Sequence, residues 1–355
     1  MAMVSFVLPV GGGGGGAHSV VQEVAAMRDL GVEARILVNR GNADGLRATY
    51  ARFALTQDGG IQAYDGPKDL ALLAAEGELL IATTNTSAHS IADAAKASRA
   101  GKFRTGYYVQ DYEPLFYAAG STEHAVAVSS YSVLRDCRYF AKTTWLTGMV
   151  AAAHGHAAAL VVPSIDHGIY RPARRAPGAR HLVTAMLRPS TPRRAPRRTL
   201  RMLARLAAGE FGPVQVAAFG TTAEELEGFG LALPEGVTLR GRLSQMEVAE
   251  LLRAADAFLD LSDYQAFGRT AAEAMACGCI TLAPSLGGAP DFITDGVSGF
   301  LANTTDDAAV AMAVRRMLSL SEAERHALRL AGLEAVAGFT PVRAAISELR
   351  ALGLG

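Results

Sequence analysis

Six consecutive glycines at residues 11–16 interrupt the start of the chain. Each glycine costs about 1 kcal/mol of ordering inside a helix, so the run predicts a loop. Residues 4–10 before it are apolar, as in a buried strand. Residues 17–30 after it have the spacing of an amphipathic helix, and residues 33–38 are apolar again. A strand, a helix and a second strand in this order predict a parallel sheet.

The same alternation continues along the chain and restarts after a break at residues 170–180, which are rich in Pro, Arg and Gly. We expect two α/β domains at 1–168 and 181–338, a linker at 169–180, and a helical segment at 339–355 that crosses back toward the first domain. Further strands are expected at 78–83, 105–110, 125–129, 159–163, 182–187, 214–219, 237–239 and 257–261, and helices at 90–100, 199–208, 245–254, 306–318 and 340–352.

Charge and composition exclude several classes of protein. Lysine plus arginine and aspartate plus glutamate both number 34, and a net charge of zero gives no support for a nucleic-acid partner. No segment has the length and apolar character of a membrane span, and the N-terminus lacks the basic start of a signal peptide. Three cysteines without a disulfide pattern are typical of a reducing compartment. We expect a cytoplasmic protein; peripheral contact with the inner face of the membrane stays open.

Residues 263–291 predict a ligand site. Gly268 precedes an Ala-rich helix that carries Glu273, Gly278 ends this helix, an apolar strand follows, and Gly287 and Gly288 open the next loop. In parallel sheets, nucleotides and phosphates bind in the crevice at the C-terminal ends of the strands. Glu273 is therefore a candidate for accepting hydrogen bonds from both ribose hydroxyls.

Two other segments suit a phosphate or diphosphate. The glycine run ends at a helix N-terminus, where backbone N–H groups bind anions; its candidate residues are Gly14, Gly15 and Gly16. Residues 171–208 hold 11 arginines and no acidic residue. Arg188 and Arg193 follow a predicted strand, the place for bidentate phosphate contacts, whereas Arg197, Arg198, Arg201 and Arg205 are better interpreted as a solvated helix face.

A polar and aromatic cluster, residues 110–117, ends the strand at 105–110. Its residue Asp111 and its aromatic neighbours suit a carbohydrate, since rings stack on sugar faces and carboxylates accept hydrogen bonds from hydroxyls. A plain packing loop is the equal alternative. Asp260 and Asp263 have no histidine or third carboxylate nearby in the sequence, so we expect no metal site.

The second half of the chain resembles a retaining glycosyltransferase of family 4, with the GT-B architecture. The resemblance rests on Arg188 and Arg193, on residues 241–247 and 254–259, and on the segment from Gln265 to Gly278, which is similar to the family's E-x7-E signature. Residues 287–291 and 295–301 complete it. The stretches 108–117 and 185–194 are similar to bacterial polysaccharide rhamnosyltransferases.

This resemblance implies two Rossmann-like domains whose parallel sheets face a central cleft. It implies a nucleotide-diphosphate sugar as donor, such as dTDP-L-rhamnose, a glycan or small-molecule hydroxyl acceptor on the first domain, and no metal or other cofactor. Arg188, Arg193, Gln265 and Asp111 would serve the transfer step. The donor would bind at the glycine loop and at Arg242, Leu243, Phe267, Gly268, Arg269, Thr270 and Glu273.

Two residues depart from the family pattern. Gln265 stands where the signature has its first Glu, and Gln110 stands where many members have a His before an Asp. A glutamine still hydrogen-bonds hydroxyls but brings no negative charge. Both changes support the alternative of a non-catalytic homologue that binds sugar nucleotides or glycans. A dinucleotide-dependent dehydrogenase is a weaker alternative, because the N-terminal loop lacks an acidic ribose ligand at the right distance.

Overall fold

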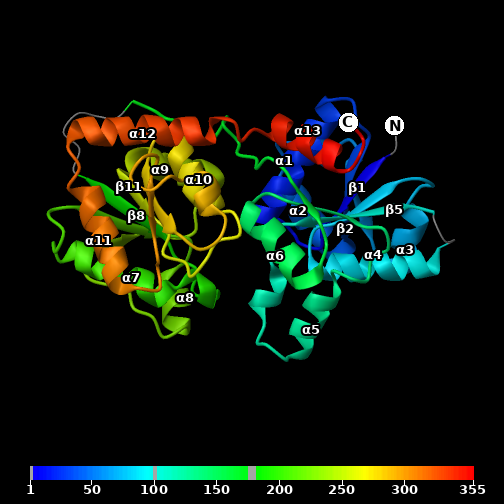
Figure 1. Ribbon diagram of the computed structural model, residues 1–355, viewed down its shortest axis with the longest axis horizontal. Coiled ribbons are helices and arrows are strands. Elements are labelled where there is room, and N and C mark those ends of the chain that lie inside the picture. The colour runs from blue at the N-terminus through cyan, green and yellow to red at the C-terminus, as the bar shows by residue number, and fades with distance from the viewer. Residues whose placement is uncertain (1–2, 99–101, 175–180) are drawn as a thin grey trace. The chain divides into compact units, whose positions relative to one another are not determined.

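The computed structural model describes residues 3–98, 102–174 and 181–355 (Figure 1). Contacts within the chain divide it into two compact units, residues 1–164 with 339–355 and residues 165–338. Half of the expected linker 169–180, residues 175–180, lies outside the described residues, as do residues 99–100 of the expected helix 90–100. Each unit is an α/β domain built on a parallel sheet, as the alternation of strands and helices predicts.

The sheet of the first unit has seven parallel strands in the order β3-β2-β1-β4-β5-β6-β7. Its strands are β1 (Val4–Val7), β2 (Ala34–Asn39), β3 (Ile61–Tyr64), β4 (Leu79–Ala82), β5 (Arg104–Val109), β6 (Arg138–Ala141) and β7 (Ala158–Leu160). Its helices are α1 (Gly15–Asp29), α2 (Arg40–Thr49), α3 (Pro67–Leu73), α4 (Asn85–Ala97), α5 (Thr122–Ser129), α6 (Thr144–His154) and α13 (Pro341–Ala351), with 3-10 turns η1 (Ala54–Thr56) and η2 (Glu113–Phe116).

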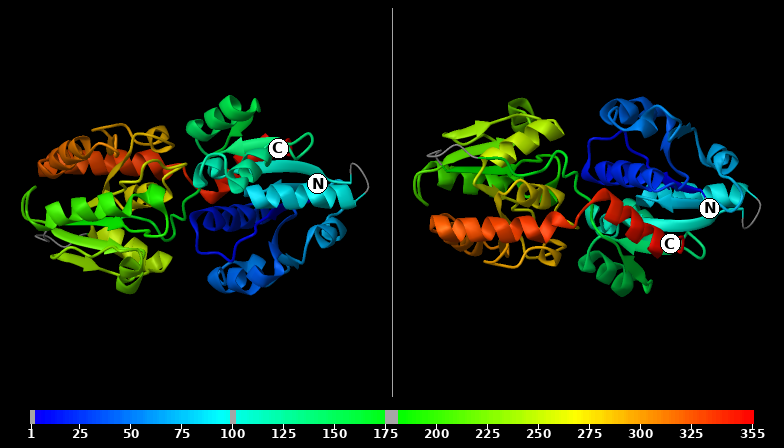
Figure 2. Two further views of the ribbon diagram at one scale, coloured as in Figure 1. Left: turned by 90° about the horizontal axis from the view of Figure 1, so that it is seen from below. Right: turned by 90° about the horizontal axis from the view of Figure 1, so that it is seen from above.

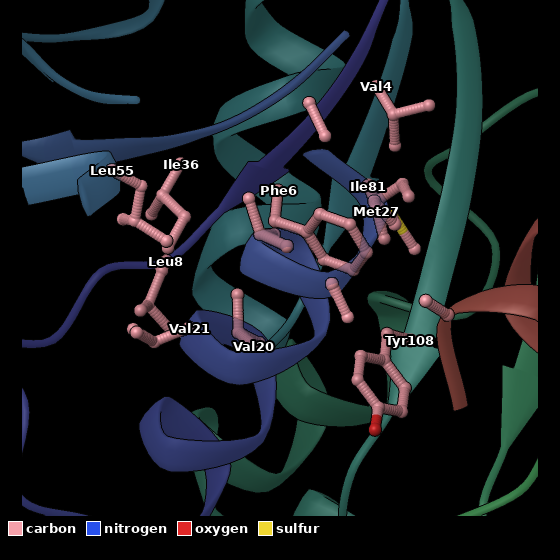
Figure 3. Packing of buried hydrophobic residues seen from close by; sticks show 14 of the residues in the cluster. Val4, Phe6, Leu8, Val20, Val21, Met27, Ile36, Leu55, Ile81 and Tyr108 are labelled. Carbon is pink, nitrogen blue, oxygen red and sulfur yellow. The ribbon is translucent and has the colours of Figure 1, made fainter. Parts of the chain in front are cut away.

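The core of this unit forms where α1 packs on the sheet. Phe6 from β1 and Val20 and Met27 from α1 are fully buried, and the close-up in Figure 3 shows them together beside Tyr108 of β5. The last helix of the chain belongs here too, since Ala345 and Leu352 join the same core. The C-terminal segment therefore belongs to the first unit.

The sheet of the second unit has six parallel strands in the order β10-β9-β8-β11-β12-β13. Its strands are β8 (Leu182–Met186), β9 (Gln215–Phe219), β10 (Val237–Leu239), β11 (Ala257–Leu259), β12 (Ile280–Pro284) and β13 (Phe300–Ala302). Its helices are α7 (Pro196–Ala207), α8 (Ala223–Gly228), α9 (Gln245–Ala254), α10 (Arg269–Ala276), α11 (Asp307–Leu318) and α12 (Glu322–Ala337), with 3-10 turns η3 (Pro192–Arg194) and η4 (Ala289–Asp291). Two further views show how these helices flank the sheet (Figure 2).

One sequence prediction of secondary structure is wrong. Residues 125–129 belong to helix α5, not to a strand. The alternation of alanine and valine there fits both structures when the run is short. The helix begins because the Ser121 hydroxyl accepts a hydrogen bond from the backbone N–H of His124, at 3.1 Å. In the described part of the chain, no helix has both the length and the apolar character needed to cross a membrane.

Candidate functional site

The sheet of the second unit changes winding direction between two neighbouring strands. After β8 the chain proceeds outward to β9 and β10, and then returns to β11 on the other side of β8. Ala185 of β8 lies opposite Leu259 of β11, so the residues that follow these strands leave the same edge of the sheet side by side. In open α/β sheets this topological switch point is where ligands bind.

Arg188 lies at this edge, and the charges of two other arginines, Arg193 and Arg242, act on it. Arg188 comes two residues after β8 and is exposed, and its Nε lies 3.4 Å from the Met186 sulfur. Among the described residues it forms no ion pair. Protein atoms around the Arg188 guanidinium partly remove its hydration, which lowers the pKa of Arg188. The positive charges of Arg193 and Arg242 lower this pKa further. Since like charges raise each other's energy, the group is suited to a polyvalent anion.

Arg193 lies in η3, on the loop that follows Arg188. Its guanidinium stands over the ring of Tyr264, 5.8 Å from the centroid. Its backbone carbonyl accepts a hydrogen bond from the Asp263 N–H at 2.8 Å. This hydrogen bond joins the loop after β8 to the loop after β11. The sequence predicts a ligand site in both loops.

Arg242 follows β10 and is largely exposed, but its guanidinium pairs with Glu225 through both carboxylate oxygens. The hydrogen bond from Arg242, helped by Thr221 and the backbone of Thr222, lowers the pKa of Glu225 to about 2. Next to Arg242, Leu243 is half-buried, and Ser244 caps α9 together with Glu247. The predicted strand–loop–helix at 237–254 is present, and one of its predicted ligand residues already has a protein partner.

The N-terminus of α10 is shaped by a glycine. Gly268 is the N-cap residue with φ +91°, a left-handed conformation that glycine adopts at little cost. Arg269 and Thr270 form the first turn, and no side chain caps the helix. Phe267 is buried against Phe292, with ring centroids 5.4 Å apart. This turn presents backbone N–H groups at the same edge of the sheet as Arg188.

Glu273 lies one turn farther into α10 and is only 5% exposed. Its carboxylate stands 3.6 Å from Arg269 and also interacts with Tyr170. Burial raises the pKa of Glu273 to about 7, and Arg269 opposes this effect only in part. The predicted ribose ligand is therefore enclosed by protein groups in this structure.

Gln265 is also buried, at 6% exposure, and hydrogen bonds hold both its backbone and its side chain in place. Its backbone carbonyl accepts a hydrogen bond from the Gly288 N–H at 2.8 Å. Its side-chain amide donates to the carboxylate of Asp260 and, at 3.1 Å, to the Ser262 hydroxyl. Sequence reasoning considered Asp260 only as a metal ligand and missed this contact. Among the residues that the structure describes, no group of His, Cys, Asp and Glu side chains could hold a metal ion.

In the first unit, the glycine run forms the loop between β1 and α1. Gly14 is the N-cap of α1, followed by Gly15 and Gly16 in its first turn. A Cβ at Gly13 or Gly14 would meet nothing within 4 Å, so these two backbone units face open space. A Cβ at Gly16 would stand 3.0 Å from the Gln110 side chain. The structure thus brings the glycine run and the residue after β5 together.

The rest of the 110–117 cluster continues from that point. Asp111 is half-buried, and its Oδ1 accepts a hydrogen bond from the Tyr112 N–H at 2.9 Å. Glu113 accepts a hydrogen bond from the backbone N–H of Asn85 at the start of α4. The apolar side chains of Leu115, Phe116 and Tyr117 are exposed. This cluster and the glycine loop lie in the first unit, whereas Arg188, Arg193, Gln265 and the α10 turn lie in the second.

Comparison with known proteins agrees with this division. Residues 192–332 match the family model described as "Glycosyl transferases group 1". The chain is 30% identical over 185 residues to the O-antigen biosynthesis protein RfbC of Myxococcus xanthus, a match that covers 52% of the chain and 11% of RfbC. It is 30% identical over 186 residues to the D-inositol 3-phosphate glycosyltransferase of Mycobacterium tuberculosis strain H37Ra, covering 47% of the chain and 37% of that enzyme. The matches thus span less than two thirds of either relative.

Solved structures extend the similarity to the whole chain. Anabaena HepE in complex with UDP and glucose superposes with a TM-score of 0.79 at 17% identity, over 99% of this chain and 100% of HepE. Sucrose-phosphate synthase from Thermosynechococcus elongatus gives 0.73 at 15% identity, over 99% and 98% of the two chains. The fold is therefore that of the GT-B glycosyltransferases, as expected. Within it, the match to the group 1 glycosyltransferase model lies in the second unit.

Proposed function

We propose that the protein is a retaining glycosyltransferase of family 4 that moves a sugar from a nucleotide-diphosphate sugar to a hydroxyl group of a glycan or small molecule. The observation that carries this proposal is Arg188, which follows β8 at the switch point of the second sheet, has no ion pair among the described residues, and feels the positive charges of Arg193 and Arg242. A diphosphate is the ligand whose charge such a group would offset.

The donor would bind on the second unit. Arg188 and Arg193 would hold the diphosphate, and the N–H groups of the Gly268–Thr270 turn would add hydrogen bonds. These groups develop their strongest interaction as negative charge grows on the leaving phosphate, which is when they lower the barrier. We infer that fixed cations perform the task that a metal ion has in other transferases, so that no metal or other cofactor is needed.

In the proposed step, the acceptor oxygen forms a bond to the anomeric carbon on the face from which the diphosphate leaves. The bond between that carbon and the phosphate oxygen breaks, and the leaving phosphate takes the acceptor proton. Retention of configuration follows from attack on this face. No side-chain nucleophile takes part. The acceptor would contact the first unit, where Asp111 and the exposed rings of Phe116 and Tyr117 suit a sugar.

The identity of the sugar and base is the finer part of the proposal. HepE was solved with UDP and glucose, which favours a uridine nucleotide. The O-antigen protein RfbC and the similarity of residues 108–117 to rhamnosyltransferases favour polysaccharide synthesis with dTDP-L-rhamnose. If the acceptor is a growing polysaccharide, the protein would act in the cytoplasm at the inner face of the membrane.

The test is a two-step assay. Binding of UDP, dTDP, GDP and ADP is first measured by calorimetry without added metal, and the sugar nucleotides of the tightest binder are then offered with candidate acceptors. We expect selective binding of one nucleotide and transfer with net retention, read by NMR of the product. Absence of binding to all four nucleotides would overturn the proposal. Binding without transfer or hydrolysis would favour the second candidate, a non-catalytic sugar-nucleotide-binding homologue, for which Gln265 is the specific argument.

A further inference from the structure

Gln265 lies in a closed hydrogen-bond network with Asp260 and Ser262. Its Nε2 donates to Asp260 Oδ2 and to the Ser262 hydroxyl. The other carboxylate oxygen of Asp260, Oδ1, accepts from the Ser262 hydroxyl at 2.5 Å and from the Ser262 N–H at 3.1 Å. All three residues are buried. Each N–H and O–H donor of the Ser262 and Gln265 side chains thus has an acceptor within this group.

This network fixes which way the Gln265 amide points. An ionised carboxylate can only accept hydrogen bonds, so the amide nitrogen must face Asp260. Both amide hydrogens are then used, one on Asp260 and one on Ser262. The amide oxygen, Oε1, consequently points to the opposite side as a neutral acceptor. The backbone of Gln265, held by Gly288, keeps this arrangement in place.

A glutamate at position 265 would not fit the same surroundings. Its carboxylate would stand against that of Asp260 without a hydrogen between them, and two carboxylates in contact cannot both stay ionised at modest cost. The amide at 265 and the acid at 260 therefore depend on each other. The negative charge of this part of the site is carried by residue 260 and not by residue 265.

The position of Asp260 in the fold suggests a function for its negative charge. Asp260 directly follows β11, and its backbone N–H bonds to Leu282 of β12 at 2.9 Å. Arg188 follows the neighbouring strand β8. The acid thus lies at the switch point that we assign to the donor, at the same edge as the proposed diphosphate ligand.

We propose that Asp260 is the positioning residue of the donor site. It holds Gln265 so that the amide oxygen accepts a hydrogen bond from a hydroxyl of the donor sugar, and it supplies the fixed negative charge behind that amide. This inference rests on the proposed function and explains how the chain works with glutamine at position 265. The glutamine is then a required partner of Asp260 and not the mark of a degenerate site.

The experiment is an exchange of the two groups. The variants are Gln265→Glu, Asp260→Asn and the double variant. In the double variant, the new amide at position 260 can donate to the new carboxylate at position 265 while it still accepts from Ser262. Gln215→Glu, at an exposed position in the same unit, is the control for the added charge. The readouts are kcat and KM for donor consumption, and melting temperature, each between pH 5 and 9.

We expect Gln265→Glu to lower kcat by about tenfold or more at pH 8, with partial recovery at low pH, where one carboxylate holds a proton. As pH rises, the melting temperature of Gln265→Glu should fall more steeply than that of the wild type. The double variant should regain most of both properties, and Gln215→Glu should match the wild type. Equal or higher kcat for Gln265→Glu with an unchanged pH profile would overturn the inference, as would a double variant no better than Gln265→Glu.

Charged groups near the network have other partners. Asp263 pairs with Arg198 of α7 at 2.8 Å, and Arg193 touches the same loop through its backbone. From the β13 side, the neutral hydroxyl of Thr304 reaches the network at the Ser262 carbonyl. Melting curves test the Asp260–Gln265 pair even if the wild type binds no nucleotide, which separates failure of this inference from failure of the proposed function.

Discussion

Gly287 lies directly against the backbone carbonyl of Gln265. A Cβ at position 287 would stand 2.0 Å from that oxygen, and Gly287 has φ +112°, which side chains with a Cβ rarely adopt. The loop after β12 and the loop after β11 can therefore approach only because residue 287 is glycine. This approach places the Gly288 N–H on the Gln265 carbonyl and completes the wall of the candidate donor site.

Replacing Gly287 by alanine should separate these two loops. We expect the substitution to lower the free energy of unfolding by at least about 2 kcal/mol, from backbone strain and steric overlap, and to weaken nucleotide binding. The measurement is denaturant unfolding together with calorimetric titration. Gly228→Ala is the control, because that glycine ends α8 with no atom within 4 Å of the added Cβ. Equal stability of Gly287→Ala and Gly228→Ala would show that the loops are not tightly joined.

Glu273 should make the stability of the second unit depend on pH. Its folded-state pKa of about 7 is above its ordinary value of 4.5, because the carboxyl is buried. The folded state therefore holds a proton that the unfolded chain has lost. Stability is complete below about pH 4.5 and decreases as pH rises toward 7. A tenfold difference in proton affinity is worth about 1.4 kcal/mol, so the loss amounts to roughly 3 kcal/mol.

Glu273→Gln should remove that decline. The check is urea unfolding at several pH values between 4 and 8, with Glu334→Gln, an exposed change on α12, as the control. We expect a flatter stability profile for Glu273→Gln and a wild-type profile for Glu334→Gln. A profile for Glu273→Gln as steep as that of the wild type would mean that the carboxyl titrates normally.

A second buried acid belongs to the first unit. Glu348 of α13 is fully buried, and Lys142 makes an ion pair of 2.8 Å with Glu23 of α1 beside it. Burial and the charge of Glu23 raise the pKa of Glu348 well above its ordinary value, although Lys142 and the Tyr108 hydroxyl oppose this. The buried carboxyl of Glu348 therefore favours its protonated, uncharged form more strongly in the folded protein than in the unfolded chain, so the docking of α13 should depend on pH.

Glu348→Gln should stabilise the docked helix at high pH. Because the folded-state pKa is raised, its stabilising effect is complete at acidic pH and is lost as pH increases; glutamine stays neutral throughout. Hydrogen exchange of the α13 amides at pH 6 and 9 measures this directly. We expect faster exchange at pH 9 in the wild type, after correction for intrinsic rates, and a smaller change in Glu348→Gln. Glu33→Gln, exposed before β2, should behave as the wild type does.

Much of the architecture could be predicted from sequence because its signals are local. The glycine run between an apolar and an amphipathic segment predicts the first strand–loop–helix unit, and it is observed as β1 and α1. Strands β3, β6 and β13 were missed, since each has only three or four residues and forms by pairing, as Phe300 does with Leu282. Helix α5 was mistaken for a strand because a short run of alternating alanine and valine carries no decisive period.

The position of a candidate site residue could be predicted from the sequence where it depends on the end of a strand. Arg188 follows an apolar run, and its place at the edge of the sheet follows from that alone. The contact between Asp260 and Gln265 has no such signal. These residues are five apart in an irregular loop, and their approach depends on Gly287 in a different loop. The burial of Glu273 against Tyr170 likewise depends on a segment that is distant in the sequence.

Arg188 provides the most direct test of the donor site. Affinity for the nucleoside diphosphate selected in the binding assay is measured by calorimetry for the wild type, Arg188→Ala and Arg197→Ala. Arg197 is an exposed arginine on α7 in the same basic segment, so its variant carries the same charge change. Loss of a charged hydrogen bond to phosphate is worth about 1.5–3 kcal/mol, or roughly tenfold or more in affinity. We predict that loss for Arg188→Ala and wild-type affinity for Arg197→Ala. Unchanged affinity in Arg188→Ala, with the variant folded, would contradict the assignment of a diphosphate to this site.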